Sequence, residues 1–218
     1  MSPSSTTPSD LEFVVRTIAR TAVDNEREFS ELDAVAGDGD FGYSLARGFE
    51  IVLADWDTLD RSSPSEFLKK VALVISKRVG GTSGPLWGTA FLRAAGAVKD
   101  KTDLNGADAV AMLRAAAEGI KTRGKSDLGD KTLLDALIPM TDALEKQLHE
   151  GDPAVGPAEL AVVAASTARG AADETTGMQA MRGRQSYTGE RSIGSPDPGA
   201  VAIAVMAERV AADWSARD

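Results

Sequence analysis

Three aspartates lie close together between residues 33 and 42, in a stretch that also holds three glycines: Asp33, Asp38 and Asp40, with Gly37, Gly39 and Gly42. Neighbouring carboxylates repel one another, by about 4 kcal/mol for a pair roughly 4 Å apart near a protein surface. A hard divalent cation reverses that sign, and Mg²⁺ prefers oxygen ligands that it shares with waters and substrate phosphates. Because glycines let the backbone turn tightly enough to aim the aspartates inward, the stretch predicts a magnesium site. An acidic, solvated turn that caps the following helix is the alternative interpretation.

The glycine pattern of residues 37–42, GDGDFG, also fits the fingerprint of dinucleotide-binding loops, but its surroundings do not. That fingerprint requires a preceding buried strand and a βαβ alternation, and residues 30–36 are too short and too polar for such a strand. An EF-hand fails as well, because Gly42 and Phe49 fall where calcium ligands are needed. The metal site and the solvated turn therefore remain.

Three further loops could bind an anion. Residues 80–85, GGTSGP, open a helix with free backbone N–H groups and two hydroxyls, an arrangement that binds anions. Residues 121–131 carry four basic and two acidic side chains, and residues 177–195 carry three and one, in a chain that is acidic overall. Each loop alone could be solvated surface, and residues 124–132 narrowly miss a P-loop because Asp130 interrupts the pattern. Together with the aspartates, these loops indicate Mg²⁺-nucleotide chemistry, in which arginines take up transition-state charge.

Composition limits the classes of function. The 218 residues include no cysteine and one histidine, His149, which excludes disulfides, thiolate zinc sites and multi-histidine metal centres. The formal net charge of −9 argues against binding to nucleic acid or to an anionic membrane, and no apolar run reaches the roughly 20 residues that span a bilayer. Residues 1–9 are polar and rich in Pro and Ser, so we expect a disordered leader on a cytoplasmic protein, followed by one domain at 10–218.

The hydrophobic periodicity is helical almost throughout. Apolar residues recur at i, i+3 and i+4, beginning with a helix from about Leu11 that Ser9 or Asp10 would cap. No convincing period-two run predicts a strand, so we expect an all-α chain, a bundle or a barrel of eight helices. The other seven helices are expected from Gly42 to about Leu53, after Pro64, after Pro85, and at 108–121, 131–148, 157–173 and 198–214.

The last connection, residues 174–199, has about 25 residues without clear periodicity. Loops longer than roughly 12–15 residues in a compact domain are usually functional or disordered. This loop carries three arginines, a tyrosine and five glycines, so we expect a functional lid or clamp.

Four segments, in order along the chain, resemble one known family. They are Leu32-Asp33 followed by GDGDFG at 37–42, GGTSGPLWGTAF at 80–91, GDKTLLDALIP at 129–139, and GRQSYTGERSIGSPDPGA at 183–200. They are similar to the L subunit, the nucleotide-binding subunit, of bacterial dihydroxyacetone kinase, which also occurs as the C-terminal domain of single-chain dihydroxyacetone kinases. The resemblance spans nearly the whole chain and implies a barrel of eight antiparallel α-helices with the nucleotide at one end.

The resemblance also implies site residues. Asp33, Asp38 and Asp40 match three family aspartates that bind two Mg²⁺ ions bridging the phosphates of ADP or ATP. Arg184 is the candidate catalytic residue. The positions that match nucleotide contacts are Phe41, Gly42, Tyr43, Ser44, Gly81, Thr82, Ser83, Gly124, Leu133, Arg184, Asp197, Pro198 and Gly199.

By the same resemblance, the chain would transfer a phosphoryl group to dihydroxyacetone or a related short ketose that a separate K subunit holds covalently on a histidine. In one form of the family a phosphocarrier M subunit recharges the bound nucleotide, and in the other form free ATP is the donor. Three positions depart from the family: Phe41 replaces a usual His or Cys, Ser195 a common His, and Ser44 a frequent Asn. These departures motivate an alternative, a nucleotide-binding regulatory module without turnover that docks a transcription factor or an enzyme.

Overall fold

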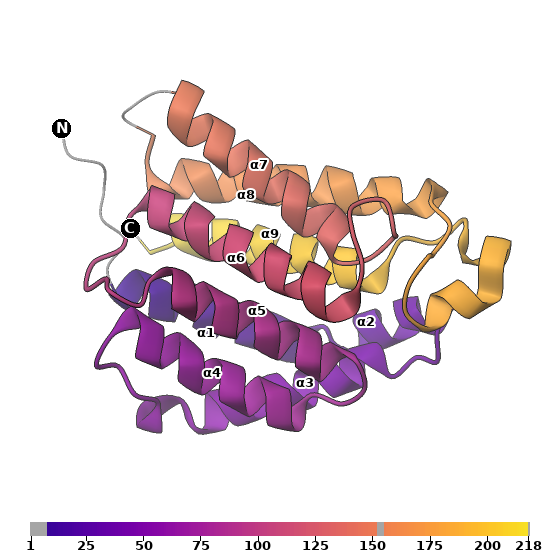
Figure 1. The fold of residues 1–218 in the computed structure, drawn as a ribbon, viewed down its shortest axis with the longest axis horizontal. Helices are drawn as coiled ribbons and strands as arrows, with labels where there is room; N and C mark the ends of the chain where they lie inside the picture. Colours follow the sequence, from indigo (N-terminus) through magenta and orange to yellow (C-terminus); the bar gives the residue numbers. More distant parts are fainter. Residues whose placement is uncertain (1–7, 152–154, 218) are drawn as a thin grey trace.

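The computed structural model describes residues 8–151 and 155–217, and all regular secondary structure in this part of the chain is helical (Figure 1). The prediction of an all-α chain is therefore confirmed, while residues 1–7 of the expected leader lie outside the described residues. The helices are α1 Pro8–Asp24, α2 Glu26–Asp33, α3 Phe41–Ala54, α4 Pro64–Arg78, α5 Ser83–Ala97, α6 Gly106–Gly124, α7 Leu134–Glu150, α8 Pro157–Glu174 and α9 Pro198–Ser215, with 3₁₀ turns η1 Trp56–Thr58, η2 Thr175–Gly177 and η3 Arg184–Ser192.

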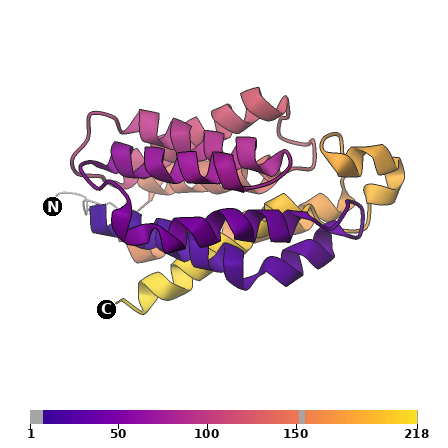
Figure 2. The same cartoon turned by 90° about the horizontal axis from the view of Figure 1, so that it is seen from below.

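The eight long helices pack side by side in a closed order. From α1 through α3 to α9, each helix contacts the next, and α9 returns to contact α1. Successive helices run in opposite directions, so every second connection lies at the same end of the molecule (Figures 1 and 2). The four connections at that end are residues 34–40, 79–82, 125–133 and 175–197. This alternation brings together loops that are up to about 160 residues apart in the sequence.

The apolar faces of the helices form the core between them. Phe29, Leu45, Phe49 and Ile75 are completely buried, and Phe49 contacts the rings of both aromatic residues at the centre of α5, Trp87 and Phe91. Aliphatic and aromatic side chains also line a cavity of about 360 Å³ between α1, α5, α6, α7, α8 and α9. No helix among the described residues is long and apolar enough to cross a membrane.

Polar residues at the expected positions fix several helix ends. The Ser63 hydroxyl accepts a hydrogen bond from the Glu66 N–H at the start of α4, with Pro64 at the first helical position. Asn105 and Asp108 form a reciprocal capping box at the start of α6. These caps explain why the predicted and observed starts of α4 and α6 agree within about two residues.

The structure adds one helix to the prediction and shortens another. Helix α2 was not predicted because its eight residues, EREFSELD, are mostly charged, and the burial of Phe29 stabilises it instead. Helix α7 begins at Leu134 and not at 131, because the Asp135 carboxylate accepts hydrogen bonds from the backbone N–H groups of Gly129 and Thr132 and holds them in a loop. The predicted loop at 174–199 contains the turns η2 and η3.

Candidate functional site

A cavity of about 460 Å³ opens among the four connections at one end of the helices. All three predicted metal-binding aspartates line it, as do ten of the predicted nucleotide contacts: Phe41, Gly81, Thr82, Ser83, Gly124, Leu133, Arg184, Asp197, Pro198 and Gly199. Segments that the sequence places far apart therefore share one cavity. Gly42, Tyr43 and Ser44 do not line it.

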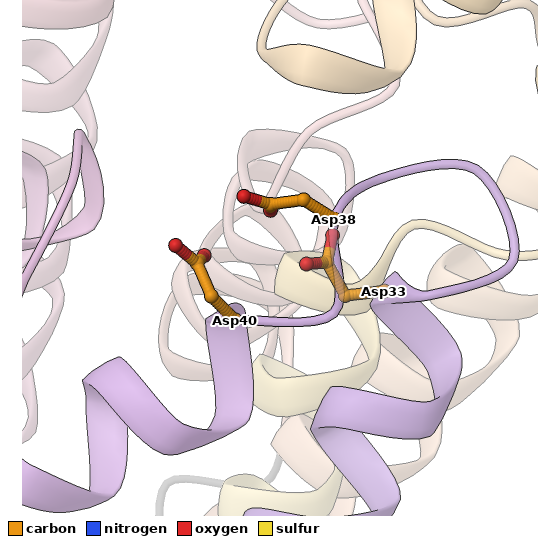
Figure 3. A group of neighbouring side chains, drawn as sticks. All are labelled: Asp33, Asp38 and Asp40. Carbon is orange, nitrogen blue, oxygen red and sulfur yellow. The ribbon is translucent and has the colours of Figure 1, made fainter.

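The three aspartates converge on one side of the turn between α2 and α3 (Figure 3). Asp33 is the last residue of α2, and Asp40 directly precedes α3. One carboxylate oxygen from each of Asp33, Asp38 and Asp40 lies within 4.8 Å of the other two. Among the described residues, this is the one group of acidic side chains with the geometry to hold a metal ion. The donor set is all oxygen and anionic, which suits Mg²⁺.

Asp33 also holds the turn together. Its side chain is buried, and one carboxylate oxygen accepts hydrogen bonds from the backbone N–H groups of Gly39, at 3.0 Å, and Phe41, at 3.4 Å. Gly37 lies so close that a Cβ atom there would be 2.2 Å from the other oxygen of Asp33. Gly39 has a φ of +75°, a conformation that favours glycine. The glycines of GDGDFG thus allow the backbone turn in which the three aspartates converge, as the sequence predicted.

Arg184 reaches the aspartates from η3. Its guanidinium forms ion pairs with Asp38 and, at 3.2 Å, with Asp40. These three side chains are all exposed, so solvent screens their charges and the pairs contribute little to stability. The guanidinium occupies the side of the carboxylates that a cation and its phosphate ligand would also approach.

The start of α5 forms a second wall of the cavity. Gly81, with a φ of +60°, turns the chain into Thr82, the N-cap residue of α5, and the first turn follows at Ser83. Gly84 packs on the backbone of Val79, where a Cβ atom would be 2.2 Å from the carbonyl oxygen. The first residues of α5, Ser83 with its N-cap Thr82, line the cavity, and a helix N-terminus in this position can bind an anion.

The three predicted contacts that do not line the cavity lie in the first turn of α3. Gly42 packs against α2, where a Cβ atom would be 2.1 Å from the Glu26 carbonyl oxygen. Tyr43 is exposed and donates its backbone N–H to Ser30. Ser44 lies next to the turn before α5, with its hydroxyl 3.0 Å from the position of a Cβ on Gly80. The structure thus gives Gly42 a packing role.

Lys131 differs from its sequence interpretation. It was counted among the basic side chains of an anion-binding loop, but only 1% of it is exposed. Its ammonium group donates hydrogen bonds to the carbonyl oxygens of Met178, at 3.1 Å, Ser195, at 2.7 Å, and Ser192. Burial lowers the pKa of this lysine, and the nearby Asp197 carboxyl opposes that effect. Lys131 therefore fixes the segment that carries Arg184, a role that local sequence does not reveal.

Asp197 is a buried cap rather than an exposed acid. Its carboxylate accepts the Ala200 N–H at 2.7 Å at the start of α9, and its own N–H donates to the Thr175 hydroxyl at 2.8 Å. The pKa of this carboxyl is raised to about 7, chiefly by burial and also by the charge of Asp135, while the backbone hydrogen bonds and Lys131 oppose the rise. The sequence placed Asp197 at the site but gave no sign of this burial.

Comparisons with known proteins identify the family of the chain. The DAK2 domain family matches residues 35–212, which include Asp38, Asp40 and Arg184. The ADP-binding subunit DhaL of the PEP-dependent dihydroxyacetone kinase of Escherichia coli (strain K12) is 39% identical over 180 residues, 83% of this chain and 84% of that subunit. The L-erythrulose 1-kinase of Mycolicibacterium smegmatis is 38% identical over 195 residues, 88% of this chain but only 33% of that kinase.

A solved structure has the same fold. The dihydroxyacetone kinase from C. freundii, in complex with AMP-PNP and Mg²⁺, superposes with a TM-score of 0.73 over 98% of this chain and 35% of that chain, at 22% identity. At this identity the likeness shows the fold, whereas the family rests on the sequence matches. The chain therefore belongs to the DAK2 domain family, which includes the ADP-binding DhaL subunits of dihydroxyacetone kinases.

Proposed function

We propose that this chain is the nucleotide-binding subunit of a cytoplasmic kinase for dihydroxyacetone or a related short ketose, with residues 10–218 as its one domain. The phosphoryl group passes from a bound Mg²⁺-nucleotide to a hydroxyketone held by a separate K subunit. The observation that carries this proposal is the convergence of Asp33, Asp38 and Asp40 beside Arg184 at a cavity of about 460 Å³. The relatives named above include both dihydroxyacetone and erythrulose kinases, so both ketoses are candidates.

The aspartates fit Mg²⁺ on two observations. One oxygen from each carboxylate lies within 4.8 Å of the other two, and in the described part of the chain Asp38 and Asp40 share a single cationic partner, Arg184, which a metal ion can displace. We propose that the three carboxylates would hold the two Mg²⁺ ions that accompany ADP or ATP. When bound, these ions neutralise phosphate charge and polarise the transferred group. Asp33, which is tied to Gly39 and Phe41, keeps the turn in the shape that this binding needs.

The cavity walls supply the remaining contacts. The N-terminus of α5, with Thr82 and Ser83, faces the phosphates with N–H groups and hydroxyls. Leu133 and Pro198, with Leu86 of α5, give one part of the cavity apolar walls against which a base can pack. We propose that Arg184 balances the charge that develops on the transferred phosphoryl group, after the nucleotide and its metals displace it from the carboxylates.

Exposed apolar side chains at the site end of the molecule, called the apolar rim below, support a protein partner there. They are Val35, Tyr43, Leu128, Met181, Tyr187 and Ile193, all about half exposed or more. Apolar and aromatic side chains exposed at one end of a molecule favour a docking surface. A K subunit docked there would bring its ketose to the phosphoryl group and would exclude water from the transfer.

The source of the phosphoryl group has two forms in this proposal. A phosphocarrier M subunit would recharge ADP that stays bound, whereas free ATP would exchange with ADP at each turnover. Gel filtration of the purified chain distinguishes them. Retained ADP identifies the form that an M subunit feeds, and a nucleotide-free chain that turns over added ATP identifies the other.

Reconstitution with a K subunit, ATP, Mg²⁺ and dihydroxyacetone tests the proposed function. We expect phosphorylated ketose to form only when both subunits are present, and an Arg184→Ala chain to lower the rate at unchanged K subunit concentration. Tight nucleotide binding without any phosphorylated ketose, with either dihydroxyacetone or erythrulose, would overturn the kinase proposal in favour of a regulatory module.

A further inference from the structure

Many of the polar groups that line the site cavity are paired within the protein. The Gly39 and Phe41 N–H groups donate to Asp33, and the Lys131 ammonium donates to three carbonyl groups. Asp135 and Asp197 accept backbone N–H groups in the same way. These donors are therefore already engaged when the cavity holds no ligand.

Gln185 differs from these residues because one of its side-chain atoms has no hydrogen-bond partner. It follows Arg184 in η3, lines the cavity, and has only 6% of its surface exposed. Its side-chain oxygen Oε1 is buried without a hydrogen-bond partner. The other atom of this kind in the described part of the chain, Arg47 Nε, lies outside the cavity and belongs to a guanidinium that already pairs with Glu26 and Glu50.

An unpartnered, buried carbonyl oxygen has lost its hydrogen bonds to water without a replacement, so a protein that keeps one at a ligand cavity gains stability when a ligand supplies the donor. The backbone around Gln185 is fixed, since its own carbonyl accepts the Thr188 hydroxyl at 2.7 Å and Lys131 anchors the following residues Ser192 and Ser195. Gln185 thus belongs to an anchored segment of the cavity lining, and its Oε1 is buried from solvent.

The chemistry of the ligand limits which atom can donate. At neutral pH the phosphates of a nucleotide have oxygen acceptors and almost no donors, while the ribose hydroxyls and a base amine are donors. We infer that Gln185 contacts the nucleoside part of the bound nucleotide, with Oε1 accepting a hydrogen bond from a ribose hydroxyl or from the base amine. This inference rests on the proposed function and adds to it a residue that recognises the nucleoside by a hydrogen bond.

Calorimetry with Gln185→Met tests the inference, because methionine keeps the length of the side chain and removes the acceptor. We expect Gln185→Met to bind Mg²⁺-ADP between about threefold and tenfold more weakly than the unchanged chain. The ligand-free variant should melt at the same or a higher temperature, since it no longer buries an unpaired acceptor. A residue with only a structural role would instead lower the melting temperature.

Nucleotide analogues identify the donor. The unchanged chain should lose affinity for one of 2′-deoxy-ADP, 3′-deoxy-ADP or inosine diphosphate, and Gln185→Met should be insensitive to that same deletion. Gln147→Met, in α7 at the opposite end of the helices, is the matched control and should bind every nucleotide as the unchanged chain does.

Two results would overturn the inference. One is unchanged affinity of Gln185→Met for Mg²⁺-ADP. The other is an equal loss for every analogue and for Mg²⁺-pyrophosphate, which would place the contact at the phosphates or at metal-bound water. If the unchanged chain failed to bind Mg²⁺-ADP at all, the proposed function itself would fail, so the two failures are distinguishable.

Discussion

At the scale of single residues, the three aspartates differ although the sequence treats them alike. Asp33 is buried and accepts backbone N–H groups, whereas Asp38 and Asp40 are exposed and pair with Arg184. Their convergence could be predicted because glycines surround them. The division of roles could not, because the burial of Asp33 depends on its position at the end of the unpredicted helix α2. The local sequence does not predict the burial of Gln185 either, since this burial arises only when η3 folds over the cavity.

Asp38→Asn should separate binding from folding. The substitution removes a proposed Mg²⁺ ligand and also one of three mutually repelling charges, so we expect Mg²⁺-ADP binding to be lost in calorimetry while the free energy of unfolding stays equal or rises slightly. Asp57→Asn, an exposed aspartate in η1, is the control and should bind normally. Unchanged affinity of Asp38→Asn would refute the metal assignment.

Asp33→Ala should reduce both the stability of the ligand-free chain and its affinity for Mg²⁺-ADP. Because the Gly39 and Phe41 N–H groups lose their acceptor, urea denaturation of the ligand-free chain should show a loss of about 1–3 kcal/mol. Asp33→Asn keeps an acceptor and should recover most of that loss without recovering Mg²⁺-dependent binding. Equal stability of Asp33→Ala and the unchanged chain would show that the turn does not depend on this carboxylate.

At the scale of elements, the sequence predicted the long amphipathic helices well, since each combines an apolar stripe with a start signal such as Ser63-Pro64 or Asn105. It failed where long-range contacts decide the structure. Helix α2 has little periodicity of its own. The shape of residues 175–195 depends on Lys131, which lies 47 to 64 residues away from its three carbonyl partners. No local pattern encodes such a contact.

Lys131→Met should weaken nucleotide binding through Arg184, because Lys131 anchors the segment that carries this arginine. We expect a loss of roughly tenfold in Mg²⁺-ADP affinity for Lys131→Met, and no further loss when Lys131→Met is added to Arg184→Ala. Lys101→Met, which removes an ion pair with Asp108 away from the site, should leave the affinity unchanged. Additive losses in the double variant would show that Lys131 acts independently of Arg184.

Asp197 should make stability depend on pH. Its pKa of about 7 lies above the ordinary value of 3.8, so between these values the folded chain binds a proton that the unfolded chain releases. The resulting stabilisation is fully present below about pH 3.8 and has been lost once the pH has risen through 7. Asp197→Asn keeps a cap acceptor for Ala200 but cannot ionise. The free energy of unfolding of Asp197→Asn minus that of the unchanged chain should therefore increase by on the order of 2 kcal/mol from pH 5 to pH 8. Parallel pH profiles would contradict the buried state of this carboxyl.

At the scale of the whole molecule, the alternation of helix directions places four connections at one end, and this arrangement builds the site. An all-helical chain with functional motifs in every second connection allowed that arrangement to be predicted. The apolar rim was not predictable, because single residues such as Tyr187 and Leu128 look like ordinary loop residues until the fold places their loops at the same end of the molecule.

Tyr187→Ala tests the proposed docking surface. Tyr187 is 89% exposed and does not line the cavity, so we expect unchanged Mg²⁺-ADP affinity but a higher K subunit concentration at half-maximal rate. Leu92→Ala removes an equally apolar, exposed side chain from α5 and should leave that concentration unchanged. If both variants behaved alike in the reconstituted assay, the rim would not be the docking surface.

A calorimetric titration of ADP into the unchanged chain, once with Mg²⁺ and once with EDTA, tests whether the acidic turn binds nucleotide through Mg²⁺. We expect one ADP bound per chain in Mg²⁺ and no measurable binding in EDTA, because Asp33, Asp38 and Asp40 then repel the phosphates. Equal affinity in both buffers, or no binding in either, would contradict this expectation.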